Sequence, residues 1–311
     1  MEKTNSSQSY AQLYNEFLSL CKIADDGGMH AIWTGEHHCM DFTIAADPCR
    51  MSPGVANRLK HVRLGTGTII APFWQPMKVA GEAAMTDRIT AGRVELGSAR
   101  GAYSVEYERL MPGMEAWEAG QRLREIIPAI RELWKGDYSH EGEFYSFPKS
   151  TSTPKPLQQN GPPIWIAARD PNSHEFAINN SCNVQVTPLW QDYNEVQDLI
   201  MKFNSAKKKC NPQSQSKIML LQHTYVSDEQ NELDEAAKKF SEFYAHFGAW
   251  FQNQRPVNQA SIKKLSLCIL VFNRPFAIVY RQIFPRQIIS ILTFIEEHIK
   301  KKQFYFFELQ G

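Results

Sequence analysis

Three consecutive residues, Glu36, His37 and His38, carry side chains that can move protons near neutral pH. They follow the apolar run 29–33, which predicts a short buried strand. We therefore expect them where the carboxyl end of a strand meets its loop, the edge that carries the active site in parallel α/β folds. His37 is a candidate general base or cofactor ligand. The alternative is a pair of structural histidines in a polar loop.

A metal site is a second interpretation of the same segment. Glu36, His37, His38 and Asp41 lie close together and have atoms that bind divalent ions. However, adjacent histidines in an extended segment point to opposite sides, and the helical HExxH spacing that brings two imidazoles together is absent. We expect no bound metal, and a metal-dependent hydrolase is kept as an alternative.

Two glycines, Gly65 and Gly67, interrupt the strand predicted over 62–70. Glycine inside a strand indicates either a bulge or the close approach of a flat ligand to the backbone, and the residues alone favour the bulge. The spacing is not GxGxxG and no helix follows directly. The sequence therefore does not support a dinucleotide-binding fingerprint.

Two arginines, Arg100 and Arg169, each follow a predicted strand. A guanidinium group can bind a phosphate or carboxylate through two hydrogen bonds. Asn172 or Ser173 can cap the helix predicted over 172–180, and helix N-termini attract anions. Many arginines at strand ends only form surface ion pairs, but two of them beside a helix start indicate a ligand that bears a phosphate.

The elements that must position these residues alternate between strand and helix, which favours a parallel sheet covered by helices. A (β/α)8 barrel and a doubly wound sheet both fit this alternation. A segment rich in Pro, Ser and Thr, 142–163, predicts a long loop that we expect to help build the substrate pocket. The predicted strands are 29–33, 62–70, 93–98, 164–168, 182–186 and 217–226, and the predicted helices are 10–24, 76–89, 116–134, 172–180, 195–210 and 228–247.

The overall composition argues for a small-molecule ligand. The 311 residues include 34 Lys and Arg against 33 Asp and Glu, so the net charge of +1 gives no reason to expect nucleic acid or an acidic membrane as partner. The six cysteines show no CxxC spacing, and the polar N-terminus does not resemble a signal peptide. The most apolar stretch is interrupted by charge and proline, so we expect no membrane span and a cytoplasmic location.

The composition changes abruptly near the C-terminus. From residue 257 onward the chain has no Asp, three acidic residues, nine isoleucines and no Gly before Gly311. The glycine and aspartate that normally form turns in an α/β protein are missing there before Gly311. We therefore divide the chain into a barrel domain, 1–256, and an aberrant C-terminal tail, 257–311.

Four segments, 32–38, 64–72, 92–101 and 164–173, together resemble the bacterial luciferase-like, flavin-dependent monooxygenase family. The resemblance spans residues 2–256 and implies a (β/α)8 barrel that holds reduced FMN at the carboxyl ends of its strands. It implies an oxidoreductase that inserts one atom of O2 into a small organic substrate, for which an aldehyde is the best-known case. A separate flavin reductase and a homo- or heterodimer are the implied partners.

The resemblance also assigns roles to residues of this chain. His37 matches the active-site histidine, with Glu36 beside it. The Gly67 to Thr68 bond lies where family members often have a non-proline cis peptide beneath the flavin ring, and Arg100 and Ser173 match the phosphate contacts. The cofactor-binding residues that it implies are Gly67, Thr68, Arg100, Arg169 and Ser173.

Both ends of the chain depart from the family pattern. The first strand and the eighth strand are not recognisable, so we expect an incomplete barrel in which two strand edges lack partners. The alternative function is then a non-catalytic or degraded barrel fragment that binds flavin weakly or pairs with an intact homologue.

Overall fold

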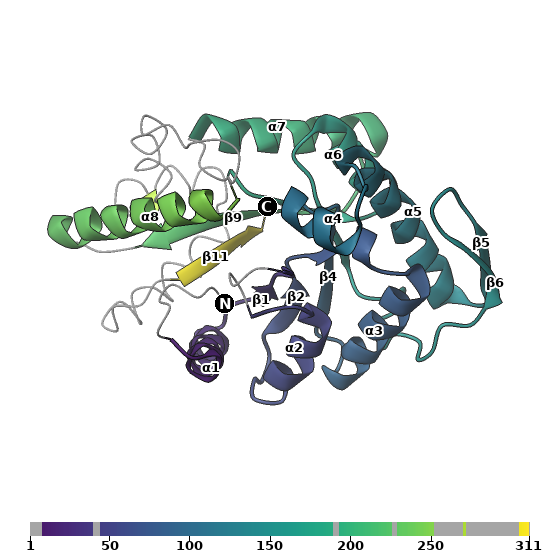
Figure 1. Ribbon diagram of the computed structural model, residues 1–311, viewed down its shortest axis with the longest axis horizontal. Helices are drawn as coiled ribbons and strands as arrows, with labels where there is room; N and C mark the ends of the chain where they lie inside the picture. Colours follow the sequence, from purple (N-terminus) through teal and green to yellow (C-terminus); the bar gives the residue numbers. More distant parts are fainter. Residues whose placement is uncertain are drawn as a thin grey trace. The chain divides into compact units, whose positions relative to one another are not determined.

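The computed structural model describes residues 8–39, 44–188, 193–225, 229–251, 270–271 and 305–310. The chain divides into two compact units, Met1–Ala167 and Ala168–Gly311. Both units contain parallel strands joined through helices (Figure 1). The α/β class predicted from the alternation of strand and helix is confirmed.

A parallel sheet forms the centre of the first unit. Its main strands follow the order β1, β2, β4, β7, each parallel to its neighbour, and the short β3 also pairs with β4. Since the strands run in one direction, their carboxyl ends share one edge. The bounds are β1 Ala31–Thr34, β2 Arg63–Thr66, β3 Ile69–Ile70, β4 Val94–Ala99 and β7 Ile164–Ala167.

Helices pack against this sheet and against one another. α2 contacts α3, and α3 contacts α5. The helix α5 buries an apolar face that includes Leu123, Ile127 and Ile130, at the spacing of three and four residues that an amphipathic helix requires. The helices are α1 Tyr10–Asp26, α2 Pro48–Ala56, α3 Pro76–Ile89, α4 Ser104–Leu110 and α5 Ala116–Lys135, with a 3-10 turn, η1, at Ala71–Phe73.

Gly65 makes room for the indole ring of Trp33. The two residues are paired in regular register between β1 and β2, so the bulge favoured by the sequence is absent at Gly65. A Cβ atom at position 65 would lie 2.1 Å from Cε3 of Trp33. The ring of Trp33 also meets Trp165 edge to face, with centroids 5.4 Å apart. Close approach of an aromatic ring explains this glycine, and the ring belongs to the protein itself.

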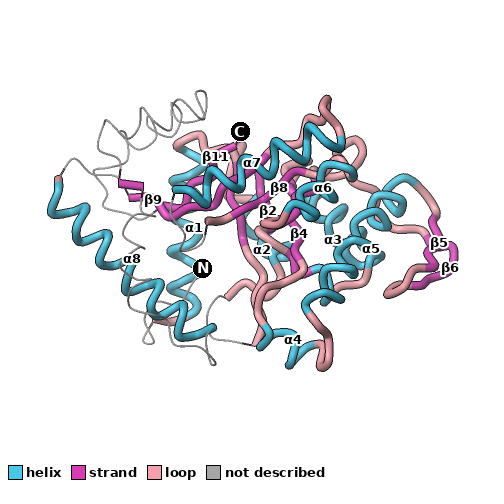
Figure 2. The backbone as a smooth tube through the Cα atoms, turned by 90° about the horizontal axis from the view of Figure 1, so that it is seen from above, coloured by secondary structure: helices cyan, strands magenta, loops and turns pink. Residues whose placement is uncertain are grey.

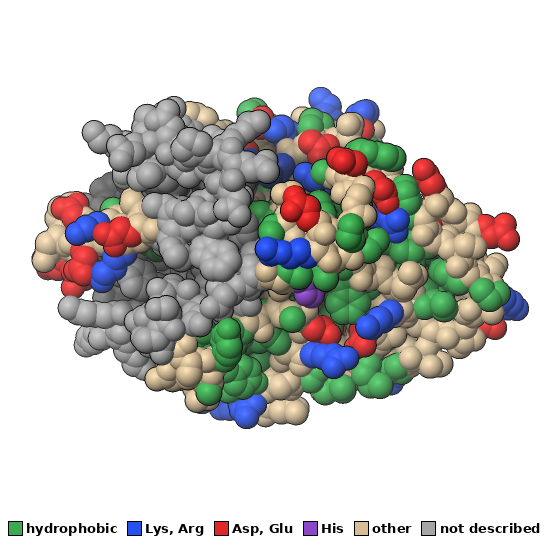
Figure 3. Space-filling view, viewed as in Figure 1, with side chains coloured by type: hydrophobic (Ala, Val, Ile, Leu, Met, Phe, Trp, Pro, Cys, Tyr) green, Lys and Arg blue, Asp and Glu red, His purple; other side chains and the backbone are tan. Residues whose placement is uncertain are grey.

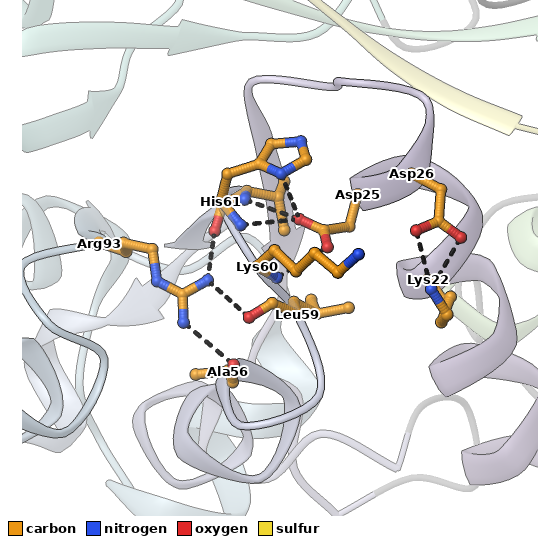
Figure 4. Close-up of polar contacts among 9 residues, drawn as sticks. Lys22, Asp25, Asp26, Ala56, Leu59, Lys60, His61 and Arg93 are labelled. Carbon is orange, nitrogen blue, oxygen red and sulfur yellow. Dashed lines mark hydrogen bonds and ion pairs between the residues drawn. The ribbon is translucent and has the colours of Figure 1, made fainter.

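Two charged side chains, Asp25 and Arg93, hold the chain in place just before β2 (Figure 4). The carboxylate of Asp25, at the end of α1, accepts hydrogen bonds from the backbone N–H groups of Lys60, His61 and Val62 at 2.7 to 3.0 Å. The guanidinium of Arg93 donates to the carbonyls of Ala56, Leu59, Val62 and Thr90. Helix ends and the loop before β2 are thereby held together.

The loop predicted over 142–163 is confirmed in part: residues 151–163 form no helix or strand, whereas 146–150 form a strand. Its first part belongs to a hairpin of β5 Tyr138–Glu141 and β6 Ser146–Ser150, which lies beside α5 (Figure 2). Further on, the backbone N–H groups of Leu157 and Gln158 donate to Asp87, and the side chain of Gln158 donates to the carbonyl of Val94, the first residue of β4.

The segment therefore contacts the amino end of β4, opposite the edge expected to carry the active site. The reason is topological, because it joins the end of α5 to the start of β7 and so approaches the sheet where strands begin. These contacts do not support the prediction that residues 142–163 help build the substrate pocket, and it stays a prediction.

The second unit repeats the alternation. β8 Asn183–Val186 is parallel to β9 Ile218–Tyr225, and the two are separated in the chain by a helix. Two strands from the segment after residue 257 also pair with β9: β10 Leu270–Val271 in parallel and β11 Tyr305–Gln310 in antiparallel direction. The expectation that the edge of the strand predicted over 217–226 lacks a partner is therefore wrong. The helices are α6 Pro171–Asn179, α7 Tyr193–Cys210 and α8 Gln230–Phe251.

The predicted division at residue 256 stays a prediction. Residues 1–7 and 252–269, where the first strand and the start of the tail were considered, lie outside the described residues, as do 272–304.

Charge is evenly distributed over the visible surface. On the face drawn in Figure 3, basic and acidic side chains are interspersed over the described part of the chain. Among the described residues, no helix is long and apolar enough to cross a membrane.

Candidate active site

The carboxyl ends of β1 and β2 are joined by backbone hydrogen bonds. The N–H of Gly67 donates to the carbonyl of Thr34 at 2.8 Å, and the N–H of Glu36 donates to the carbonyl of Thr68 at 3.2 Å. The peptide bond between Gly67 and Thr68 is cis, as the family resemblance implied. It separates β2 from β3, so the single strand predicted over 62–70 is divided at this point.

Glu36 is buried, with 2 % of its surface exposed, and its carboxylate has several hydrogen-bond partners. Its carboxylate accepts hydrogen bonds from the backbone N–H of Ile70 at 2.8 Å and from the indole N–H of Trp74 at 3.0 Å, and Nε2 of His38 lies 2.5 Å away. A carboxylate with this many partners holds its neighbours in place. Glu36 therefore connects the loop after β1 to the loop after β2.

His38 lies against the same carboxylate. The hydrogen bond with Glu36 raises the pKa of His38 above its ordinary value of 6.5, although partial burial opposes the shift. Its ring also meets Phe73 edge to face at a centroid distance of 5.8 Å. His38 and Glu36 thus form an ion pair when the imidazole is protonated.

His37 takes a different environment from His38. Nδ1 of His37 lies 3.4 Å from Oε1 of Glu106, and the side chain is 24 % exposed. The ring centroid is 5.4 Å from that of Tyr103. The two histidines are similarly exposed and each faces a carboxylate, but His37 lies farther from its carboxylate than His38 does.

Glu106 and Tyr103 were missed by reasoning from the sequence. Both follow β4, and Glu106 lies in the short helix α4. An acidic residue in a short helix is usually exposed, so its type alone did not indicate a functional site. In the structure Glu106 is 1 % exposed and accepts a hydrogen bond from the backbone N–H of His38 at 2.7 Å. One feature of the sequence could have identified Glu106: its position a few residues after Arg100, at the sheet edge predicted to carry the active site.

Arg100 presents an exposed guanidinium at the end of β4. Its Nη1 donates to the carbonyl of Ala116 at 3.4 Å, while its own carbonyl accepts from the hydroxyl of Tyr107 at 2.5 Å. Gly101 follows with a φ of +89°, and a Cβ there would lie 2.9 Å from the Tyr107 hydroxyl oxygen. The backbone is therefore held tightly, while the guanidinium is exposed and its hydrogen bond to Ala116 uses one of its five N–H groups.

Arg169 and Ser173 belong to the second unit and are engaged there. The guanidinium of Arg169 contacts the carboxylate of Glu195 and the carbonyl of Thr187. The hydroxyl of Ser173 donates to Asp170 at 2.5 Å, and its backbone N–H donates to the same carboxylate at 3.0 Å. Asp170 thus caps α6 with a negative charge.

The first unit has groups that fit a flavin nucleotide. The outward guanidinium of Arg100 matches a phosphate. In addition, Oγ1 of Thr34 and Oγ of Ser98, at the carboxyl ends of β1 and β4, are buried and have no hydrogen-bond partner among the described residues. Buried hydroxyls without partners are uncommon and suit a polar ligand or water.

The metal interpretation gains no support from these contacts. His37 and His38 face different glutamates, and the described residues contain no group of three or more His, Cys, Asp or Glu side chains able to hold a metal ion. Asp41 lies outside the described residues.

This chain is similar in sequence and in fold to proteins of known function. The chain is 61 % identical over 266 residues to the oxygenase component of the flavin-dependent trigonelline monooxygenase of Acinetobacter baylyi, covering 86 % of this chain and 74 % of that protein. Among solved structures, the oxygenating constituent of 3,6-diketocamphane monooxygenase from Pseudomonas putida, in complex with FMN, matches with a TM-score of 0.64 at 16 % identity over 78 % of this chain and 73 % of its own.

A third similar protein is described as dependent on F420. An F420-dependent secondary alcohol dehydrogenase matches with a TM-score of 0.70 at 14 % identity over 87 % of this chain and 86 % of its own. These two structures show a shared fold, and the (β/α)8-type fold predicted from the resemblance is confirmed at this level. The family model of the luciferase-like monooxygenases matches residues 2–266, and the chain therefore belongs to the luciferase-like monooxygenase family.

Proposed function

We propose that this chain is the oxygenase component of a two-component monooxygenase, which takes reduced FMN from a separate flavin reductase and oxygenates an N-methylpyridinium carboxylate. The observation that carries the proposal is the 61 % identity to the trigonelline oxygenase component. Trigonelline is a betaine in which a pyridinium ring bears an N-methyl group and a carboxylate. This substrate class replaces the aldehyde suggested by the resemblance alone.

The residues of the first unit support FMN as the cofactor. In this proposal Arg100 pairs with the phosphate, and the backbone of Gly67 and Thr68 lies beneath the ring system. Bound reduced flavin supplies the electrons that activate O2. In this proposal His37 is the group that carries the proton, and Glu36 keeps His38 and Trp74 in position.

Two further cofactor contacts are part of the proposal. Ser173 and Arg169 are matched by the family resemblance, yet they now contact Asp170 and Glu195. Their participation requires these contacts to be exchanged for contacts to the ligand. An Asp170→Asn variant, which removes the competing charge, should then strengthen FMN binding rather than weaken it.

The cellular setting that we propose is a reducing cytoplasm, with the enzyme acting as a homo- or heterodimer. The five cysteines among the described residues, Cys21, Cys39, Cys49, Cys182 and Cys210, are free thiols. Free cysteines are typical of reducing compartments.

The direct test is turnover by the purified chain supplied with NADH, FMN, a flavin reductase and O2. Trigonelline and a long-chain aldehyde are offered separately, and the product is identified by mass spectrometry. Trigonelline consumption with gain of one oxygen atom supports the proposal. Turnover of the aldehyde alone, or saturable flavin binding without turnover of either compound, would contradict it and favour another substrate class or the non-catalytic alternative.

A further inference from the structure

We propose that Tyr103 and Arg109 determine the substrate specificity of the site: the ring of Tyr103 packs against the pyridinium, and the guanidinium of Arg109 pairs with the carboxylate. The inference rests on the proposed function and deepens it, because it assigns the two charges of a betaine to two residues of this chain. Both residues belong to α4 or its N-terminal cap.

One side of α4 faces the loop that follows β1. The ring centroid of Tyr103, the N-cap residue, lies 5.4 Å from that of His37, and Oε1 of Glu106 lies 3.4 Å from Nδ1 of the same histidine. Nη1 of Arg109 donates to the carbonyl of Cys39 at 2.7 Å. The spacing of three residues from Tyr103 to Glu106 to Arg109 is that of neighbours on one helix face. This face therefore brings an aromatic ring, a carboxylate and a guanidinium to the candidate active-site loop.

The charges around this loop differ in sign between the interior and the surface. The carboxylates of Glu36 and Glu106 are buried, whereas Arg100 and Arg109 are exposed. A betaine of the proposed class carries its positive charge on a flat ring and its negative charge on a strongly hydrated carboxylate. Binding is therefore most favourable with the ring near the buried carboxylates and the substrate carboxylate towards an exposed arginine.

Tyr103 has the kind of surface that a cationic ring prefers. Its side chain is half-buried, and the electron-rich face of an aromatic ring attracts a cation that lies within about 6 Å of its centroid. The quaternary nitrogen of an N-methylpyridinium has no hydrogen to donate, so an aromatic face and a nearby negative charge are the groups that recognise it. Glu106 supplies that negative charge from the same side of α4.

Arg109 is suited to the substrate carboxylate. Its hydrogen bond to the carbonyl of Cys39 uses one of its five N–H groups, and a guanidinium can bind a carboxylate through two parallel hydrogen bonds. The contact with Cys39 also holds the side chain against the loop that carries His37. Less side-chain entropy is then lost when a ligand binds.

The test compares three ligands of the same shape. Trigonelline carries both charges, 1-methylpyridinium-3-carboxamide lacks the carboxylate, and 3-methylbenzoate lacks the positive charge on the ring. Binding of each to the wild-type protein in the presence of FMN is measured by isothermal titration calorimetry. We expect trigonelline to bind at least about 10-fold more tightly than either analogue. Equal affinity for all three ligands overturns the inference without any variant.

Substitution of Arg109 tests the carboxylate contact. Arg109→Gln keeps an N–H donor for the carbonyl of Cys39 but removes the charge. It should raise Kd and KM for trigonelline by about 10- to 100-fold and leave Kd of the carboxamide cation unchanged. Equal weakening of both cations would show damage to the loop and contradict the assignment of Arg109.

Substitution of Tyr103 tests the contact with the ring. Tyr103→Leu should raise Kd of both pyridinium cations by about 3- to 30-fold and leave Kd of 3-methylbenzoate unchanged. Tyr103→Phe, which keeps the aromatic face, should restore most of the affinity. Equal loss for all three ligands in Tyr103→Leu, or no rescue by Tyr103→Phe, contradicts the assignment of Tyr103.

Arg88 provides a matched control. It is an exposed arginine on α3 that donates to the backbone carbonyls of Lys155 and Pro156. Arg88→Gln removes the same charge and should leave Kd of all three ligands at the wild-type value. Weakened trigonelline binding in Arg88→Gln equal to that in Arg109→Gln would mean an effect of net charge alone and overturn the inference.

The inference and the proposed function fail in different ways. If the wild-type chain does not turn over trigonelline but binds it through Tyr103 and Arg109, the proposed function fails and the inference stands. If trigonelline is oxygenated and both variants keep the wild-type Kd and KM, the proposed function stands and the inference is overturned. A wild-type chain that binds none of the three ligands contradicts both.

Discussion

Nε2 of His38 lies 2.5 Å from Oε1 of Glu36, and this carboxylate also accepts hydrogen bonds from the backbone of Ile70 and the indole of Trp74. One buried acid thus joins residues that lie up to 38 positions apart in the chain. The contributions of this and other polar contacts to stability, pH dependence and cofactor binding can each be measured with a separate substitution.

The ion pair of Glu36 and His38 should make stability depend on pH. Because the pKa of His38 is raised above 6.5 in the folded state, the pair contributes fully below that pH, and its contribution is lost as the pH rises through the folded pKa. The melting temperature of Glu36→Gln should therefore fall furthest below wild type at low pH. Thermal unfolding from pH 5 to 9 measures this, and in a His38→Gln background the difference should no longer vary with pH.

Asp25 should stabilise the fold through its backbone hydrogen bonds. Burial acts to raise its pKa, but the N–H donors of Lys60, His61 and Val62 outweigh burial and hold the pKa at about 2. The contribution is present above the ordinary value of 3.8 and is lost as the pH falls towards 2. We expect Asp25→Asn to cost about 2 to 3 kcal/mol at neutral pH by urea unfolding.

The adjacent residue is the control for this prediction. Asp26 is exposed and pairs with Lys22 within α1, so Asp26→Asn should leave the midpoint of urea unfolding almost unchanged. Equal losses in the two variants would show that the backbone hydrogen bonds of Asp25 are unimportant.

Gly65→Ala should destabilise the first unit, since the added methyl group would lie 2.1 to 2.4 Å from atoms of the Trp33 ring. Overpacking of a buried site typically costs about 1 to 3 kcal/mol. At Gly136 an added Cβ meets nothing within 4 Å, and the backbone there is extended. Gly136→Ala should therefore unfold like wild type, and a neutral Gly65→Ala would mean that Trp33 can move aside.

Arg100→Ala should weaken binding of FMN by about 10- to 100-fold while leaving binding of riboflavin, which has no phosphate, almost unchanged. Fluorescence titration of both flavins measures this. The control is Arg58→Ala, because Arg58 is also exposed and donates to a single backbone carbonyl, that of Gly54 in α2. A parallel loss of both flavins in Arg100→Ala would argue against a phosphate contact.

The sequence was sufficient to predict the class of fold and the edge that carries the candidate site. Apolar runs such as 29–33 and the helical spacing in 116–134 are local signals, because strand and helix periodicity depend on neighbours within a few residues. His37 and Arg100 could be placed at carboxyl ends for the same reason. Arg100 directly follows β4, and His37 comes three residues after the last residue of β1.

The tertiary structure decided which side chains meet across the sheet. The contact of Glu106 with His37 joins residues 69 positions apart, and the fit of Gly65 against Trp33 depends on the register of β1 and β2. The path of 142–163 along the amino end of β4 likewise follows from the order of the strands. Local sequence carries little information on such contacts, because they depend on how distant segments pack, and packing is settled only when the whole sheet forms.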